Sequence, residues 1–295
     1  MPIGEISAIV AALAWAIGSL LYGFIGKRAS AAAMNAGKLL TGVVVLATAR
    51  ALWMGSAWPA GTRAREMALL AISGLIGLAV GDTAYFGAIR AIGAPRALLM
   101  LSGAPVIATL IGLGMDEPLT ARDAAGIVVT LAGIGMVIYR RNGGELSRAM
   151  LVRGVALAAL AALCQAVGAI LARMGMKQGM DPLGASVVRL AVGLAGMAVL
   201  GWGSGQSKGW LSELGRERTW MKVAGAALIG TCVGVFLSLV ALARSRSVGV
   251  ASTLLATSPV FVLPIAHAFK IERASLRGVA GTILAVAGVG LLAWR

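Results

Sequence analysis

Residues 132–140, AGIGMVIYR, return 155 positions later as residues 287–295, AGVGLLAWR. The same spacing relates further residues, which are Glu117 and Glu272, Arg122 and Arg277, and Gly126 and Gly281. One match of this kind would carry little weight, but a series in a single register indicates that the chain is a duplication. The sequence therefore predicts two halves with the same fold.

The composition places both halves in a membrane rather than in water. The 295 residues are 59% hydrophobic and 13% charged, with a mean hydropathy of +0.91, whereas about 25% of the residues of a soluble domain are charged. A transmembrane helix needs about 20 consecutive apolar residues. Apolar runs near this length predict ten helices, at residues 3–26, 31–53, 67–92, 94–115, 124–140, 154–176, 183–202, 220–243, 247–269 and 278–294.

The predicted fold is an all-α polytopic membrane protein with ten transmembrane helices in two inverted five-helix repeats. We assign residues 1–140 to the first repeat, residues 141–153 to a polar linker and residues 154–295 to the second repeat. Because each half has an odd number of spans, the two copies must lie in the bilayer with opposite orientations. Inverted repeats are typical of transporters whose two halves rock around a central site.

The positive charge of the chain indicates contact with the membrane surface rather than with nucleic acid. The 26 Lys and Arg residues give a formal net charge of +15, but most of them lie in the short gaps between apolar runs. On the predicted topology, fifteen lie on the side opposite the termini and nine on the side of the termini. Since positively charged loops remain in the cytoplasm, this count predicts termini outside the cytoplasm.

Several motifs resemble those of a known transporter family. Residues 81–89, GDTAYFGAI, are followed by residues 92–97, IGAPRA, and residues 104–106, APV; the second half carries ALA at 241–243 and SPV at 258–260. This pattern is similar to the third-to-fourth-helix signature of EamA-type carriers in the drug/metabolite transporter superfamily, and the resemblance spans the whole chain. It implies ten helices from two repeats, with both termini in the cytoplasm, which is the orientation opposite to the one that the charge count predicts.

The resemblance also implies metabolite transport without ATP hydrolysis, often export of amino acids, and the family includes aromatic amino-acid exporters. We therefore predict an amino-acid exporter in the bacterial inner membrane, functional as a monomer, with protons as the candidate coupling ion. Sugars, nucleotide sugars and cationic drugs are the alternative substrates, and an intramembrane enzyme or a receptor is the alternative class. The sequence contains no P-loop, zinc-ligand spacing or nucleophile elbow, so we predict no catalytic residue, metal or cofactor.

Three ionisable side chains, those of Lys38, Asp82 and Arg189, lie well inside predicted helices, where each costs roughly 2.5 to 3.5 kcal/mol on insertion scales. Lys38 and Arg189 occupy equivalent places in the two halves, and the inversion predicts that they lie toward opposite membrane faces. Asp82 has no acidic equivalent, and its carboxylate suits a substrate amino group or a proton. We predict that all three bind substrate; the alternatives are snorkelling for the cations and a hydrogen bond to a neighbouring helix for Asp82.

Other residues in the helices are candidates for lining or gating the pathway. Five polar or amphipathic side chains are predicted to bind substrate, with packing as the alternative: Tyr85, Trp15, Gln165, Asn35 and Ser102. Pro259, Pro264 and Gly81 are predicted to gate or hinge the helices, because proline and glycine allow them to bend. An acid and a cation around aromatic side chains would suit an amino acid, whereas a multidrug site would lack the cations. His267, the only histidine, is placed as a solvated cap, with proton coupling as the alternative.

Overall fold

The computed structural model describes residues 3–113, 120–138, 147–245, 248–270 and 275–293, which form helices and short connections. The predicted boundary between residues 140 and 141 lies outside the described residues. The helices of the first half are α1 (Ile3–Ile25), α2 (Ala31–Met54), α3 (Ala64–Ser73), η1 (Gly74–Gly81), α4 (Asp82–Ile92), α5 (Ala94–Leu101), α6 (Ala104–Leu113) and α7 (Ala121–Ile138). The sequence motif that begins at Gly81 therefore starts at a junction between two kinds of helix.

The second half follows the same order. Its helices are α8 (Arg148–Met176), α9 (Pro182–Gly203), α10 (Ser207–Gly215), η2 (Arg216–Arg218), α11 (Thr219–Ala227), η3 (Leu228–Val233), α12 (Gly234–Arg244), α13 (Val248–Leu255), α14 (Ser258–Ala268) and α15 (Leu276–Ala293). Helix α8 starts at Arg148, within the predicted linker, and α10 and η2 lie between two predicted spans. Seven helical stretches in the described residues are long and apolar enough to cross a membrane.

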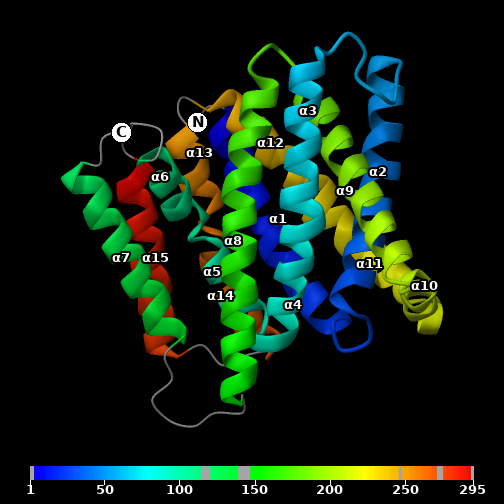
Figure 1. Cartoon of the computed structure of the whole chain (residues 1–295). Coiled ribbons are helices and arrows are strands. Elements are labelled where there is room, and N and C mark those ends of the chain that lie inside the picture. The colour runs from blue at the N-terminus through cyan, green and yellow to red at the C-terminus, as the bar shows by residue number, and fades with distance from the viewer. Residues whose placement is uncertain (1–2, 114–119, 139–146, 246–247, 271–274, 294–295) are drawn as a thin grey trace.

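Figure 1 shows that the helices run between two ends of the bundle. Helix α1 begins and α15 ends at the same end of the bundle, which we call the terminal face. Helices α2 and α8 begin at the other end, the opposite face. Within the described residues, the chain makes ten helical passes between the two faces, in agreement with the predicted all-α polytopic fold.

The last helices of the two halves, α7 and α15, pack against each other through glycines. A Cβ atom added to Gly133 would lie 2.5 Å from the carbonyl oxygen of Gly281, and one added to Gly126 would lie 2.9 Å from that of Gly288. Gly126 is the repeat equivalent of Gly281, and Gly133 is that of Gly288, so each contact becomes the other when the halves are exchanged. The partner numbers fall as α7 advances, so the helices are antiparallel. This reciprocal contact confirms the predicted inversion of the repeats.

A second reciprocal contact joins each half's first helix to the other half's third pass. A Cβ atom on Gly18 of α1 would lie 2.8 Å from the Cα atom of Gly230 in η3, and one on Gly168 of α8 would lie 3.2 Å from that of Gly77 in η1. Glycine allows helix backbones to approach this closely in a membrane. Both crossings place the π-helical turns at the centre of the bundle.

Helices α2 and α9 begin at side-chain caps that fix their position. The hydroxyl oxygen of Ser30 accepts a hydrogen bond from the N–H of Ala33, at 3.2 Å, and Asp181 accepts one from the N–H of Gly184, at 2.6 Å. Such caps satisfy N–H groups that have no partner within the helix. Asp181 also pairs with the buried Arg50 of α2 at 3.2 Å. This contact ties the start of α9 to the end of α2, and these two helices carry Lys38 and Arg189.

The fourth pass of each half, predicted over residues 94–115 and 247–269, is broken. Pro259 and Pro264 were predicted to bend the second of these spans, whereas no break was predicted in the first. Helix α5 ends before Ser102, and α13 ends at Leu255; the next helix then starts with a proline as its second residue, Pro105 in α6 and Pro259 in α14. Proline has no N–H and is tolerated in the first turn of a helix, so the chain restarts there. Pro264 lies inside α14, and its role as a hinge remains a prediction.

Candidate functional site

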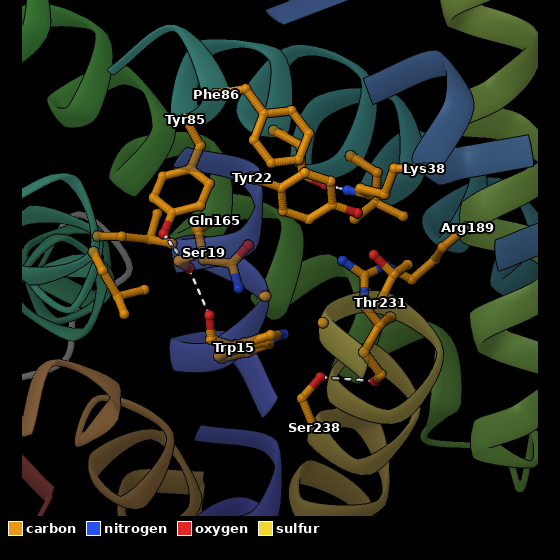
Figure 2. Close-up of a pocket in the computed structure, with 17 residues that line it drawn as sticks. Trp15, Ser19, Tyr22, Lys38, Tyr85, Phe86, Gln165, Arg189, Thr231 and Ser238 are labelled. Carbon is orange, nitrogen blue, oxygen red and sulfur yellow. Dashed lines mark hydrogen bonds and ion pairs between the residues drawn. The ribbon is translucent and has the colours of Figure 1, made fainter. Parts of the chain in front are cut away.

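A chamber lies between the two halves, and Figure 2 shows the side chains that line it. Its volume is about 650 Å³, counted with its open side. It lies among α1, α2, η1, α4, α5, α8, α9, η3 and α12. The polar, charged and aromatic residues that line it are Trp15, Ser19, Tyr22, Lys38, Asp82, Tyr85, Phe86, Gln165, Arg189, Thr231 and Ser238. All three ionisable residues that the sequence analysis selected therefore meet in one cavity.

Lys38 and Asp82 form an ion pair at one wall of the chamber. Their side chains are 5% and 20% exposed, so the pair is largely desolvated and each charge depends on the other. The ammonium nitrogen of Lys38 also lies 5.6 Å from the centre of the Phe86 ring, within the range of a cation–π interaction. Asp82 is the first residue of α4, directly after η1, where the backbone changes from π-helix to α-helix.

Arg189 lies on another wall of the chamber and makes no ion pair with the described residues. The residue is 5% exposed, and its Nε atom is buried without a hydrogen-bond partner among the described residues. A Cβ atom on Gly77 would lie 3.4 Å from Nη2 of Arg189, so this glycine leaves room for the guanidinium. The inversion predicts opposite depths for Lys38 and Arg189, yet both line one chamber, because each side chain is long enough to reach it from its own helix.

Aromatic side chains form a second part of the chamber wall. The rings of Tyr22 and Phe86 have centres 4.5 Å apart, and those of Tyr85 and Phe86 are 6.0 Å apart. The hydroxyl of Ser19 donates to the carbonyl oxygen of Trp15, at 2.5 Å, and lies 2.7 Å from that of Tyr85. Since Ser19 has a single proton, Tyr85 is the donor in the second bond. This wall offers the apolar surface of the rings, and the hydroxyl of Tyr85 already has a hydrogen-bond partner in Ser19.

The structure separates the predicted site residues into two groups. Six of them line the chamber: Asp82, Lys38, Arg189, Tyr85, Trp15 and Gln165. Ser102 lines a neighbouring cavity, Gly81 packs on Cys164, and His267 is exposed in α14. Sequence reasoning missed Ser19, Tyr22 and Phe86, although a signal existed. Ser19 and Tyr22 follow Trp15 by four and seven residues, and Phe86 follows Asp82 by four, which places each on the same helix face as the residue it follows.

Asn35 lies outside both described cavities and supports the helix that carries Asp82. It is fully buried, and its Nδ2 atom lies 2.8 Å from the carbonyl oxygen of Leu78, 3.1 Å from that of Ala79 and 2.9 Å from the hydroxyl of Thr83. A π-helical turn shifts hydrogen bonds by one residue, and an amide donor from α2 satisfies the carbonyl oxygens there. The structure thus gives this residue a contact with backbone rather than with the chamber.

We expect Asn35→Leu to lower the stability of the protein by about 1 to 3 kcal/mol, because the substitution removes the amide donor to the buried carbonyl oxygen of Leu78, while that of Ala79 keeps a hydrogen bond from the Thr83 hydroxyl. Thermal unfolding of the purified protein in detergent measures the change. Thr41→Val on the same helix is the matched control, since among the described residues Thr41 donates to the carbonyl oxygen of Gly37 within α2 and to no other helix. Equal melting temperatures for the two variants would contradict a supporting role for Asn35.

A vestibule joins the chamber to the terminal face. Its volume is about 1570 Å³, counted with its open space. It extends along α8 to Arg173 and Lys177, at the end where α8 reaches the terminal face. It shares six lining residues with the chamber: Trp15, Leu98, Leu101, Gln165, Arg189 and Ser238. The chamber therefore borders a cavity on the terminal side.

Toward the opposite face, the helices pack tightly around buried side chains. The closing cluster consists of Tyr22, Ile25, Met34, Ile89, Ile92 and Leu98. Beyond it, Arg28 forms an ion pair with Glu217, and Glu213 accepts a hydrogen bond from the N–H of Ser30 at 2.6 Å. These contacts join the first half to α10 and η2 of the second half. The structure has one side of the chamber packed and the other side hollow.

Comparison with known proteins gives this geometry a family. The model of the EamA-like transporter family matches residues 2–139 and matches again at residues 152–294. The chain belongs to the EamA-like transporter family. Membership makes it a multi-pass membrane protein and a transporter of the drug/metabolite transporter superfamily, in agreement with the sequence analysis. The family points to transport without an enzymatic reaction.

The comparison with solved structures agrees with the fold of this EamA-family transporter. A chain titled "Crystal structure of protein" superposes with a TM-score of 0.65 at 16% sequence identity, over 98% of this chain and 95% of that chain. A search of curated proteins found no match. The likeness to the solved chain shows the shared fold alone.

Proposed function

We propose that this EamA-family transporter exports an aromatic amino acid across the bacterial inner membrane, with the chamber as its binding site. The observation that carries the proposal is the meeting of Lys38, Asp82 and Arg189 with four aromatic side chains in one cavity. A zwitterion has one group for an acid and one for a base, and charge-assisted hydrogen bonds serve both. The rings of Tyr22, Tyr85, Phe86 and Trp15 provide apolar surface for an aromatic side chain.

Asp82 is the acid that faces the substrate's amino group in this proposal. In the absence of substrate, Asp82 forms an ion pair with Lys38. When the substrate binds, its carboxylate becomes a new ion-pair partner for Lys38 and Arg189. The carboxylate of Asp82 then becomes available to the ammonium group of the substrate or to a proton. A cationic drug, the main competing substrate, would need the acid and the rings but would be repelled by Lys38 and Arg189.

Two features support alternating access. The two halves are inverted repeats, yet the chamber is hollow on one side and packed on the other. The vestibule opens the chamber toward the terminal face, and the closing cluster packs the other side. If the two halves exchange conformations, the packed side opens and the hollow side closes. With the termini in the cytoplasm, as the family resemblance implies, the described state faces inward and is ready to load a substrate for export. One chain supplies the whole chamber, which supports function as a monomer.

The experiment that tests this proposal is uptake of labelled amino acids into proteoliposomes that contain the purified chain. We expect saturable uptake of phenylalanine, tyrosine or tryptophan, with weaker uptake of leucine and none of lysine above the level of protein-free liposomes. A proton gradient of either sign, applied in parallel, tests whether protons drive the movement. Saturable uptake of a cationic dye without uptake of any aromatic amino acid would refute the proposal in favour of a multidrug carrier.

A further inference from the structure

The chamber and the vestibule meet around Arg189, a buried cation that makes no ion pair with the residues that the structure describes. Arg189 lines both cavities together with Gln165 and Trp15. Figure 2 shows its side chain extending from the wall into the chamber, toward the side where Gln165 and Trp15 lie. The residue is 5% exposed, and its Nε atom has no hydrogen-bond partner among the described residues. A buried guanidinium in this state is costly unless an anion binds to it.

The charges that line the cavities favour an anion along the whole route. In the chamber Lys38 and Asp82 neutralise each other, so Arg189 leaves one positive charge. The vestibule adds Arg173 and Lys177, and no Asp or Glu is among the described residues that line it. A cleft lined by charges of one sign attracts ligands of the opposite sign and repels those of the same sign. The net positive charge of the two cavities therefore favours a negatively charged ligand group.

The amino group of a substrate gains much less from this arrangement. Asp82 already has a partner in Lys38 inside a largely desolvated site. An ammonium group that binds Asp82 must either displace Lys38 or share the carboxylate with it, so the new contact adds less than a contact with an unpaired carboxylate would. The carboxylate, in contrast, meets a guanidinium that pairs with no acid in the described part of the chain, and it can form two parallel hydrogen bonds with that guanidinium.

We propose that a carboxylate bound at Arg189 is the obligatory element of recognition, and that the substrates are aromatic carboxylic acids with or without an α-amino group. This inference rests on the proposed function, from which it takes the aromatic part of the substrate. It extends that function to a substrate class that lacks the amino group. Arg189 selects the carboxylate, and the aromatic wall selects the ring.

Three ligands that share a phenyl ring and a two-carbon spacer distinguish the contribution of the carboxylate to binding from that of the amino group. Binding of phenylalanine, 3-phenylpropanoate and 2-phenylethylamine to the purified chain in detergent is measured by equilibrium dialysis. We expect 3-phenylpropanoate to bind within about tenfold of phenylalanine, and 2-phenylethylamine to bind about 100-fold more weakly, as loss of a partner from a buried charge predicts. Binding of phenylalanine but not of 3-phenylpropanoate would overturn this inference alone. Binding of none of the three, together with no uptake of phenylalanine, tyrosine or tryptophan, would overturn the proposed function as well.

Substitutions at Arg189 test whether this residue makes the selection. We expect Arg189→Gln to weaken the binding of 3-phenylpropanoate by about 100-fold. Arg189→Lys should weaken it by about tenfold, because lysine lacks the forked pair of donors of the guanidinium. The first variant should also bind 2-phenylethylamine more tightly than the unmodified chain does, since repulsion is removed; a general loss of packing would not have this effect. Arg65→Gln, at an exposed position in α3, is the matched control. Unchanged affinity of Arg189→Lys and Arg189→Gln for the carboxylate would overturn the assignment.

Discussion

Replacing Asp82 with Asn is expected to reduce the initial rate of substrate uptake by about 100-fold or more. The substitution leaves the ammonium of Lys38, which is 5% exposed, without its ion-pair partner. Removing one member of a buried pair costs about 3 to 5 kcal/mol. It also leaves two positive charges in the chamber and no acid with which a substrate amino group or a proton can exchange. Uptake into proteoliposomes, normalised to the amount of folded protein, measures the loss.

A double substitution separates the stability of the ion pair from its part in transport. Lys38→Met combined with Asp82→Asn removes both charges, so the folded yield should recover toward that of the unmodified chain. Uptake should remain low, because the exchangeable acid is still missing. Recovery of uptake in the double variant would reduce the ion pair to a supporting element of the fold. Unchanged uptake in both Asp82→Asn and Lys38→Ala would remove the chemical basis of the proposed site.

The parts of the structure that could be predicted from sequence depend on properties of single segments. Ten apolar runs predicted ten passes, since each run must satisfy its own length requirement in the bilayer. The repeat at residues 132–140 and 287–295 predicted the inversion, and the contact between α7 and α15 confirms it. Lys38, Asp82 and Arg189 were selectable because a charge inside an apolar run is costly wherever its neighbours lie.

The parts that could not be predicted depend on contacts between segments. The π-helical turns η1 and η3 interrupt spans that read as regular helices, and each changes which side chains face the chamber beyond it. The carbonyl oxygens of η1 are satisfied by Asn35 from another helix, which no local pattern reveals. Tyr22 lies near the end of its apolar run, where a tyrosine is usual at a membrane interface. Only the packing of α1 on α4 places its ring on Phe86.

The contact between α7 and α15 joins parts of the chain that are far apart in sequence, so it helps to hold the two halves together. Helices α7 and α15 belong to different halves, and their backbones meet at Gly126, Gly133, Gly281 and Gly288. In a membrane, helices associate through close packing rather than through exclusion of water. Side chains larger than glycine at these positions would therefore separate the two halves along their mutual contact.

We expect Gly133→Leu to destabilise the protein by about 3 kcal/mol or more, because overpacking forces the backbones apart. Its Cβ atom would overlap the backbone nitrogen of Ala285 and would lie 2.5 Å from the carbonyl oxygen of Gly281. Gly135→Leu is the matched control on the same helix, since a Cβ atom there meets nothing described within 4 Å. Thermal unfolding and the fraction of monodisperse protein after purification measure the difference. If both variants melt at the temperature of the unmodified chain, α7 and α15 can separate without loss of the fold, and their reciprocal contact does not hold the two halves together.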